Sequence, residues 1–167
     1  NYLYAVDVKT GQEKWKFKTE DEVPSSPAVA DGMVFFGSGD SYLYAVDVKT
    51  GQEKWKFKTE EKVYSSPAVA DGMVFFGSWD NYLYAVDVKT GQEKWKFKTE
   101  DDVWSSPAVA DGMVFCGSFD SYLYALDVKT GQEKWKFKAK GRVLSSPAVA
   151  DGMVFFGSFD NYLYAVE

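Results

Sequence analysis

The sequence predicts an all-β protein built from repeated four-stranded antiparallel sheets, and three observations support this prediction. Nearly all of the 167 residues form four near-identical copies of one 40-residue unit, with seven residues left over. Each copy holds four short strand-forming runs separated by turns rich in Gly and Asp. No segment shows the 3.6-residue periodicity of an amphipathic helix. Four-stranded units of about 40 residues in tandem are typical of the blades of a β-propeller.

The first complete copy, residues 21–60, begins with two strands of different character. Residues 25–29 are Ser, Pro, Ala and Val, and such small side chains predict a first strand in a crowded inner position. Asp31 and Gly32 then predict a turn. Residues 33–36 are all apolar, which predicts a second strand covered on both faces by neighbouring sheets.

The second half of the copy predicts two further strands. Residues 42–47 form the third strand, and the turn at residues 48–51 follows it. Residues 53–58 form the fourth strand, in which Trp55 and Phe57 alternate with lysines. This alternation predicts one packed face and one solvated face, and the lysines discourage pairing with the edge of another sheet.

The composition excludes several classes of protein. With 46% hydrophobic and 18% aromatic residues, the chain can bury a core and is not disordered. Its net charge of −6 argues against a nucleic-acid partner, and no apolar run approaches the roughly 18 residues of a membrane helix. The absence of His removes the commonest general base and metal ligand. The single cysteine, Cys116, replaces a Phe of the second strand and is expected to be buried and unreactive.

A spaced motif recurs in every copy. Residues 45–55 match the pattern A-x-D-x-x-T-G-x-x-x-W, and so do residues 5–15, 85–95 and 125–135. The motif resembles the tryptophan-docking motif of the PQQ-type (quinoprotein-like) β-propeller repeat. The resemblance implies that the tryptophan ending each motif stacks against the next blade and ties the blades together. These structural tryptophans are Trp15, Trp55, Trp95 and Trp135.

The resemblance does not extend to a cofactor. Quinoprotein dehydrogenases add Ca²⁺ ligands, a catalytic aspartate and quinone-binding residues outside the repeat pattern, and no residue here stands out from the repeat. The recurring aspartates are expected to hydrogen-bond their own turns. They are Asp7, Asp31, Asp47, Asp71, Asp87, Asp111, Asp127 and Asp151. We therefore expect a protein that is not an enzyme and that binds no cofactor and no metal.

The repeat boundaries predict three complete blades and one divided blade. The complete blades are residues 21–60, 61–100 and 101–140, and the divided blade combines residues 141–167 with residues 8–20. Propellers of the family that the chain resembles commonly have seven or eight blades. The leading hypothesis is therefore a propeller of eight blades formed head to tail by two chains, which leaves no open sheet edge. A closed four-bladed monomer and a fragment of a longer repeat chain are the alternatives.

The two ends of the chain carry the same strand. Residues 1–7 repeat residues 161–167 with only the last residue changed. The divided blade needs a single copy of the third strand of the unit, but the two ends of the chain provide two copies. The sequence leaves open which of them is used.

The few differences between the copies cluster in the sequence. Seven of the nine variable positions lie in two segments, which we call the inter-unit connection (equivalent to residues 19–24) and the middle turn (equivalent to residues 39–41). Because the strands alternate in direction, both segments are expected at the same face of a propeller. The turns at the other face never change, as in a constant scaffold that carries a variable surface.

The variable positions carry residues suited to recognition. Aromatic side chains and arginine are frequent in binding hot spots. The candidate binding residues are Glu22, Pro24, Lys62, Tyr64, Trp79, Asp102, Trp104, Phe119, Arg142, Leu144 and Phe159. They predict a non-catalytic scaffold that presents an aromatic and charged face to a protein, peptide or glycan. In one alternative these side chains plug the central channel or pack between blades. In another the chain is a designed or reconstructed repeat scaffold with no ligand of its own.

Overall fold

The computed structural model describes all 167 residues, which form five antiparallel sheets in chain order. The strands are β1 (Tyr2–Val6), β2 (Glu13–Lys18), β3 (Ala28–Ala30), β4 (Met33–Gly37), β5 (Tyr42–Asp47), β6 (Glu53–Lys58), β7 (Ala68–Ala70), β8 (Met73–Gly77), β9 (Tyr82–Asp87), β10 (Glu93–Lys98), β11 (Ala108–Ala110), β12 (Met113–Gly117), β13 (Tyr122–Asp127), β14 (Glu133–Lys138), β15 (Ala148–Ala150), β16 (Met153–Gly157) and β17 (Leu163–Val166). Sheets β3–β6, β7–β10 and β11–β14 have four strands. The pair β1–β2 precedes them, and the three-stranded sheet β15–β17 follows them.

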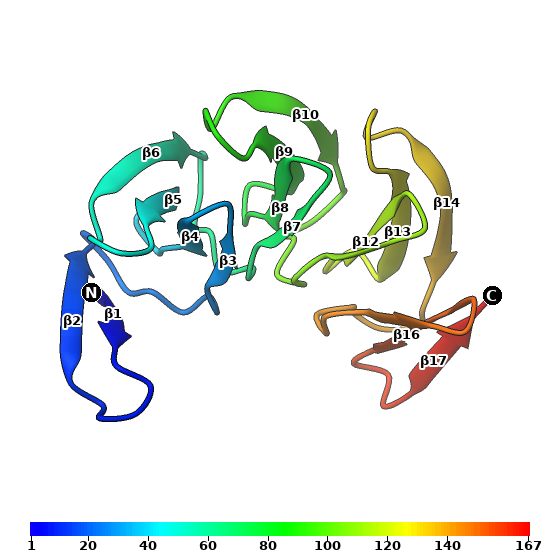
Figure 1. Ribbon diagram of the computed structural model, residues 1–167. Coiled ribbons are helices and arrows are strands. Elements are labelled where there is room, and N and C mark those ends of the chain that lie inside the picture. The colour runs from blue at the N-terminus through cyan, green and yellow to red at the C-terminus, as the bar shows by residue number, and fades with distance from the viewer.

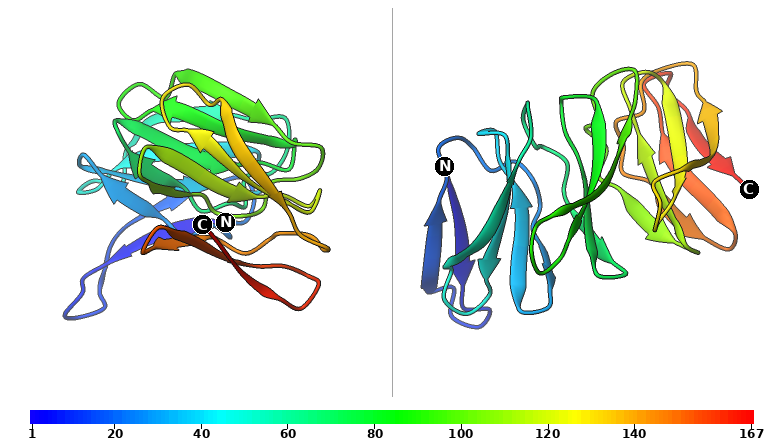
Figure 2. Two further views of the ribbon diagram at one scale, coloured as in Figure 1. Left: turned by 90° about the vertical axis from the view of Figure 1, so that its right-hand side faces the viewer. Right: turned by 90° about the horizontal axis from the view of Figure 1, so that it is seen from above.

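The sheets follow one another in an open arc, with the N- and C-termini at its two ends (Figure 1; Figure 2, right). Within each sheet the hydrogen-bonded neighbours are consecutive in the chain, so each sheet is an up-and-down meander. The all-β fold of repeated four-stranded antiparallel sheets is therefore confirmed. Residues 8–20 and residues 141–167 lie in different sheets. Their union in one blade stays a prediction.

The first strand of each unit differs from its prediction. In the first complete copy it covers Ala28–Ala30 and not residues 25–29. Pro27 has no N–H for a sheet ladder. Ser25 uses its hydroxyl instead, because Ser25 Oγ donates to the Gly37 carbonyl at 3.0 Å and accepts from the Gly37 N–H at 2.7 Å. Side-chain hydrogen bonds thus hold this inner segment where the sequence predicted a strand.

The core lies between neighbouring sheets. Strand β4 is buried along its whole length, as its continuous apolar run predicted. Phe35 belongs to a cluster with Phe76 of the following sheet, and Phe36 belongs to a cluster with Phe17 of the preceding one. Strand β4 therefore packs against both neighbouring sheets, and separating two sheets would expose aromatic surface to water.

The tryptophan of the fourth strand bridges two sheets. Trp15 Nε1 donates to the Val48 carbonyl of the next sheet at 3.1 Å, and Trp55 and Trp95 make the equivalent bonds at 3.2 and 3.1 Å. The Trp15 indole lies against Gly51, where a Cβ would come within 2.7 Å of the ring. Gly51 also has a φ of 70°, so both its space and its conformation require glycine.

Candidate recognition surface

The two variable segments of each sheet lie side by side. In the second complete copy, the backbone N–H of Trp79 in the middle turn donates to the carbonyl of Lys62 in the inter-unit connection at 3.0 Å. The equivalent bonds join Gly39 to Glu22, Phe119 to Asp102, and Phe159 to Arg142. Side chains of both segments therefore emerge at the same end of the strands.

An invariant aspartate builds the middle turn. Asp40 Oδ1 accepts from the Tyr42 N–H at 3.2 Å, and Asp40 Oδ2 accepts from the Tyr44 hydroxyl at 2.8 Å. Asp40 Oδ2 also accepts from the Glu20 N–H at 3.1 Å, which fastens the turn to the inter-unit connection. Ser41 has a φ of 69°, a left-handed conformation that short polar side chains tolerate best. The position accordingly alternates only between Ser and Asn among the copies.

Four aromatic side chains of these segments form a continuous strip, which we call the aromatic row: Tyr64, Trp79, Trp104 and Phe119. The centroids of consecutive rings are 4.6, 4.4 and 4.8 Å apart. Trp79 follows β8 and Trp104 precedes β11, so their stack crosses a sheet boundary. All four side chains are half-buried. The row therefore packs between blades and still offers part of its surface to solvent.

A charged group caps the first end of the row. Lys62 Nζ lies 3.8 Å from the Glu22 carboxylate and 5.6 Å from the Trp79 ring centroid. The Tyr64 hydroxyl donates a hydrogen bond to Glu22. Hydrogen bonds with the side chains of Asp21 and Tyr64 lower the pKa of Glu22 to about 2, so this carboxylate stays charged at neutral pH.

The middle and the far end of the row differ in their polar contacts. Trp79 Nε1 and Trp104 Nε1 are buried and have no hydrogen-bond partner. Asp102 lies beside Trp104, and burial raises the pKa of its carboxyl group. At the far end, the guanidinium carbon of Arg142 lies 4.9 Å from the Phe119 ring centroid, a cation–π contact.

Three other candidate residues lie on the same segments without joining the row. Pro24 and Leu144 are the equivalents of Tyr64 in the first and last copies, and they provide no aromatic ring there. Phe159 lies at the C-terminal end of the arc and is 68% exposed. The row is therefore confined to the middle sheets.

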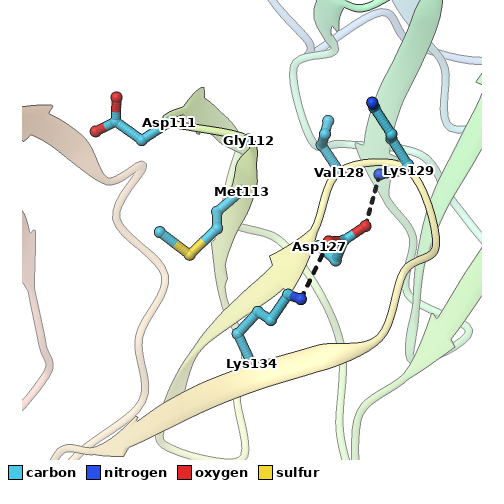
Figure 3. A pocket seen from close by; sticks show the side chains of 7 residues that line it. All are labelled: Asp111, Gly112, Met113, Asp127, Val128, Lys129 and Lys134. Carbon is cyan, nitrogen blue, oxygen red and sulfur yellow. Dashed lines mark hydrogen bonds and ion pairs between the residues drawn. The ribbon is translucent and has the colours of Figure 1, made fainter.

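The opposite face carries one open pocket in each complete sheet, and sequence reasoning missed these pockets. Their volumes are about 340, 430 and 490 Å³ from the first to the third complete sheet. The residues of the largest are Asp111, Gly112, Met113, Asp127, Val128, Lys129 and Lys134 (Figure 3). The sequence signal that could have indicated these pockets is the pair of polar turns, equivalent to residues 31–32 and 48–51, that are the same in every copy and meet at this face.

One of the two acidic groups of the largest pocket, Asp127, is engaged by its own turn. Asp127 Oδ1 accepts from the backbone N–H groups of Lys129 and Thr130 at 3.1 and 3.0 Å, and Asp127 Oδ2 lies 3.2 Å from Lys134 Nζ. Hydrogen bonds from Thr130 and then from Lys134 lower the pKa of Asp127 to about 2. This carboxylate therefore holds its own turn and is a poor general base.

The structure offers no donor set that fits a metal-held quinone. No group of three or more His, Cys, Asp or Glu side chains is placed to hold a metal ion. Cys116 is fully buried, and burial raises the pKa of its thiol to about 12, so the thiol stays neutral. The fold contains no helix of the length and apolarity needed to cross a membrane.

Comparison with solved structures gives the same fold. BamB from Moraxella catarrhalis is 21% identical with a TM-score of 0.82, and the match covers 93% of this chain and 49% of that one. The computationally designed Ika8 protein is 20% identical with a TM-score of 0.87, covering 98% and 51%. The quinohemoprotein alcohol dehydrogenase ADHIIG from Pseudomonas putida HK5 is 20% identical with a TM-score of 0.83, covering 98% and 37%. The chain thus spans about half the length, or less, of these three proteins.

The sequence comparison identifies the family. No curated protein sequence matches the chain. A family model described as outer membrane protein assembly factor BamB, of PQQ-type repeats, matches residues 1–103 and 82–167. Together with the repeated four-stranded sheets, this match over the whole length shows that the chain belongs to the PQQ-type β-propeller repeat family.

Proposed function

We propose that the chain is a non-catalytic binding scaffold that holds a protein, peptide or glycan against the aromatic row. One observation carries the proposal: the four rings touch in sequence, and all of them arise at positions where the repeats differ. Large rings supported by one another offer apolar area with few rotatable bonds, which reduces the entropy lost on binding.

The chemistry of the row favours a ligand with flat apolar groups and hydrogen-bond acceptors. The indole faces suit apolar rings or the C–H face of a sugar, and Arg142 and Lys62 suit carboxylates. The unpaired N–H group of Trp79 costs about 1–3 kcal/mol while it is buried. A ligand that shifts this ring supplies the missing acceptor, through a carbonyl in a peptide or a hydroxyl in a glycan.

The family description favours a protein segment among these ligands. The matching model is described as an outer membrane protein assembly factor, and assembly requires contact with other proteins. Carried over to this chain, that description supports a protein or peptide partner as the first ligand to test. Nothing in the description identifies which protein.

A non-catalytic role agrees with the groups that the surface offers. The chain has no His, and the Cys116 thiol is buried and neutral. Asp127, one of the two acids of the largest pocket, is occupied by its own turn and by Lys134. None of these groups is free to act as a nucleophile or a general base.

A second candidate is a designed or reconstructed repeat scaffold with no ligand of its own. The near-identity of the four copies and the structural similarity to the designed Ika8 protein favour it. The isolated changes at Cys116 and Leu126 weigh against it, because both side chains lie inside the core and a designer has little reason to introduce them.

We also propose a second copy of the chain as a partner. The sheets at both ends of the arc leave apolar side chains in solvent: Tyr4 is 56% exposed, Val6 is 57% exposed and Leu163 is 75% exposed. Closing two arcs into one propeller would give the sheet at each end a neighbour and remove both open edges.

Peptide and glycan arrays test the binding proposal. The unaltered chain is compared with the triple variant Trp79→Ala, Trp104→Ala, Arg142→Ala. The control is Lys49→Ala, Lys89→Ala, Lys129→Ala, which changes three equivalent lysines at the opposite face. We expect the control to keep the ligands of the unaltered chain and the triple variant to lose them. An unaltered chain that binds nothing supports the second candidate, and unchanged binding by the triple variant overturns the row as the site.

A further inference from the structure

The two ends of the arc expose what the middle sheets bury. Leu163 in the last sheet is 75% exposed, whereas its equivalent Leu43 is fully buried. Val8 after the first strand is 96% exposed, whereas its equivalent Val88 is 2% exposed. The inference developed from these ends rests on the proposed pairing of two copies, and it specifies how the copies join.

At the C-terminal end of the arc a docking tryptophan has no turn to contact, and at the N-terminal end the turn that would receive a tryptophan has none beside it. In the middle of the arc, Trp55 donates to Val88 and its ring covers Gly91. Trp135 has no such turn beside it, and its indole N–H makes no hydrogen bond. Gly11 occupies the equivalent turn position in the first sheet, and no atom lies within 4 Å of the place where its Cβ would be.

A contact between glycine and valine is incomplete in the same way. Gly37 lies so close to Val63 of the next sheet that a Cβ would collide with it, and Val63 is fully buried. Gly157 in the last sheet meets no valine, because a Cβ placed there would have only Ser145 within 4 Å, with the Ser145 Oγ at 3.6 Å. Val23 in the first connection is only half-buried. The last sheet lacks the valine that the first connection exposes.

The charges of the inter-unit connections also match across the ends. Glu22, Lys62, Asp102 and Arg142 alternate in sign along the arc, and Lys62 Nζ lies 3.8 Å from Glu22 of the preceding copy. In a head-to-tail pair, Arg142 is followed by Glu22 of the second copy. The alternation therefore continues without placing like charges side by side.

We infer that the β1–β2 hairpin of a second copy enters the last sheet and takes the place of β17. Residues 2–6 and 162–166 have the same sequence, so β16 can pair with β1 in the register it has with β17. Phe156, for example, lies opposite Tyr164 and would lie opposite Tyr4 of the second copy. Strand β2 arrives with β1 and provides the fourth strand of this blade.

The turn of the hairpin decides which copy of the third strand is used. Asp7 accepts from the backbone N–H groups of Lys9 and Thr10 at 3.0 Å each, and its carboxylate lies 3.2 Å from Lys14 Nζ. If β17 stayed in place, β1 would be pulled away from β2 and these contacts would break. Replacing β17 keeps them, and the strand pairs lost on β16 form again with an identical sequence.

A tyrosine of β1 also gains its missing partner. Tyr44 and Tyr164 donate their hydroxyl protons to Asp40 and Asp160 at 2.8 and 2.6 Å. Tyr4 is the equivalent tyrosine of the first strand, and it is 56% exposed with no aspartate beside it. In the exchanged sheet Tyr4 lies in the place of Tyr164 and can donate to Asp160. The exchange at both ends of two chains then gives eight four-stranded blades.

Two matched cysteine pairs test the inference in a Cys116→Ala background. Val154 lies opposite Val166 in the sheet β15–β17, and after the exchange it lies opposite Val6 of the second copy. We expect Val154→Cys with Val6→Cys to form a disulfide between two chains on oxidation. We expect Val154→Cys with Val166→Cys to remain reduced. Non-reducing electrophoresis separates a linked pair from the single chain of 18.8 kDa.

Two further readouts use the unaltered chain. Light scattering gives the assembled mass, and chymotrypsin followed by mass spectrometry shows which terminus is displaced. A mass of two chains with cleavage inside residues 162–167 supports the exchange. A single-chain mass overturns the pairing of copies itself. A two-chain mass with trimming at residues 1–7, or a disulfide only in the Val154→Cys with Val166→Cys variant, keeps the pairing and overturns the exchange.

Discussion

The indole of Trp104 lies flat on the indole of Trp79, with centroids 4.4 Å apart and 3° between the ring planes. One ring comes from a middle turn and the other from the connection into the next sheet. The stack thus joins two blades at the face where the repeats vary, while Trp55 and its equivalents join them elsewhere. Cohesion between blades and the proposed recognition surface share the same atoms.

The stack should contribute measurably to stability. We expect Trp79→Ala and Trp104→Ala to be non-additive, with a coupling of about 0.5–1.5 kcal/mol in the free energy of unfolding. Urea denaturation of the two single variants and the double variant gives this value. A second cycle that pairs Trp79→Ala with Phe159→Ala is the control and should be additive, because these rings form no contact pair. Additivity in both cycles would contradict the stack.

The hydrogen bond from the Trp55 indole to the Val88 carbonyl should contribute about as much to the free energy of unfolding as an average protein hydrogen bond. Trp55→Phe keeps most of the ring and removes the N–H that reaches Val88, so we expect a loss of about 0.5–1.5 kcal/mol in the free energy of unfolding. Trp135→Phe is the matched control in dilute protein, where its N–H has no acceptor and the loss should be near zero. At concentrations where two copies associate, Trp135→Phe should become as costly as Trp55→Phe. An equal cost at all concentrations would contradict this account.

The turn aspartates should make the fold sensitive to strong acid. Hydrogen bonds and the ion pair with lysine lower the pKa of Asp47, Asp87 and Asp127 from 3.8 to about 2 in the folded chain. A lowered folded-state pKa means that the stabilisation is complete above about pH 4 and is lost as the pH falls towards 2. The melting temperature should therefore fall between pH 4 and pH 2. Asp87→Asn should flatten part of this dependence, and an unchanged slope in that variant would exclude Asp87 as a source.

The single cysteine should be inert in the folded chain. Burial raises the pKa of the Cys116 thiol to about 12, so almost none of it is thiolate at pH 8. We expect no labelling by iodoacetamide in the native state and full labelling in denaturant, as mass spectrometry can show. Rapid native labelling would mean that the sheet β11–β14 opens readily.

Calcium with the quinone cofactor should leave the melting temperature unchanged. The chain holds no cluster of acidic, His or Cys side chains that fits a metal ion. A ligand that binds only the folded state raises the melting temperature, and the stabilisation grows with the logarithm of its concentration relative to its dissociation constant. Differential scanning calorimetry with and without both ligands checks this. A rise at low ligand concentration would revive an enzymatic role.

Much of the fold could be predicted because the same pattern of strands and turns recurs in each copy of the repeat. The predicted third and fourth strands, residues 42–47 and 53–58, have the bounds of β5 and β6. The first strand was misplaced because Ser25 hydrogen-bonds through its side chain, and no residue pattern distinguishes such a bond from a strand ladder.

The candidate surface could be predicted only as a set of positions. The differences between copies singled out Trp79 and Trp104, but their stack depends on how far one sheet is offset from the next, which the sequence does not encode locally. The pockets around Asp127 and its equivalents were missed because their residues never vary, and invariant turns indicated only a scaffold.

The contact between each docking tryptophan and its glycine has a consequence for how such a chain can change. Because the three junctions at Trp15, Trp55 and Trp95 use the same pair, one complete unit can follow another without refitting the backbone. Unequal crossing-over between copies would therefore change the order of side chains such as Tyr64 and Phe119 while keeping the packed contacts between units. A gene of this kind can sample new surfaces by rearranging its own modules, with no point mutation required.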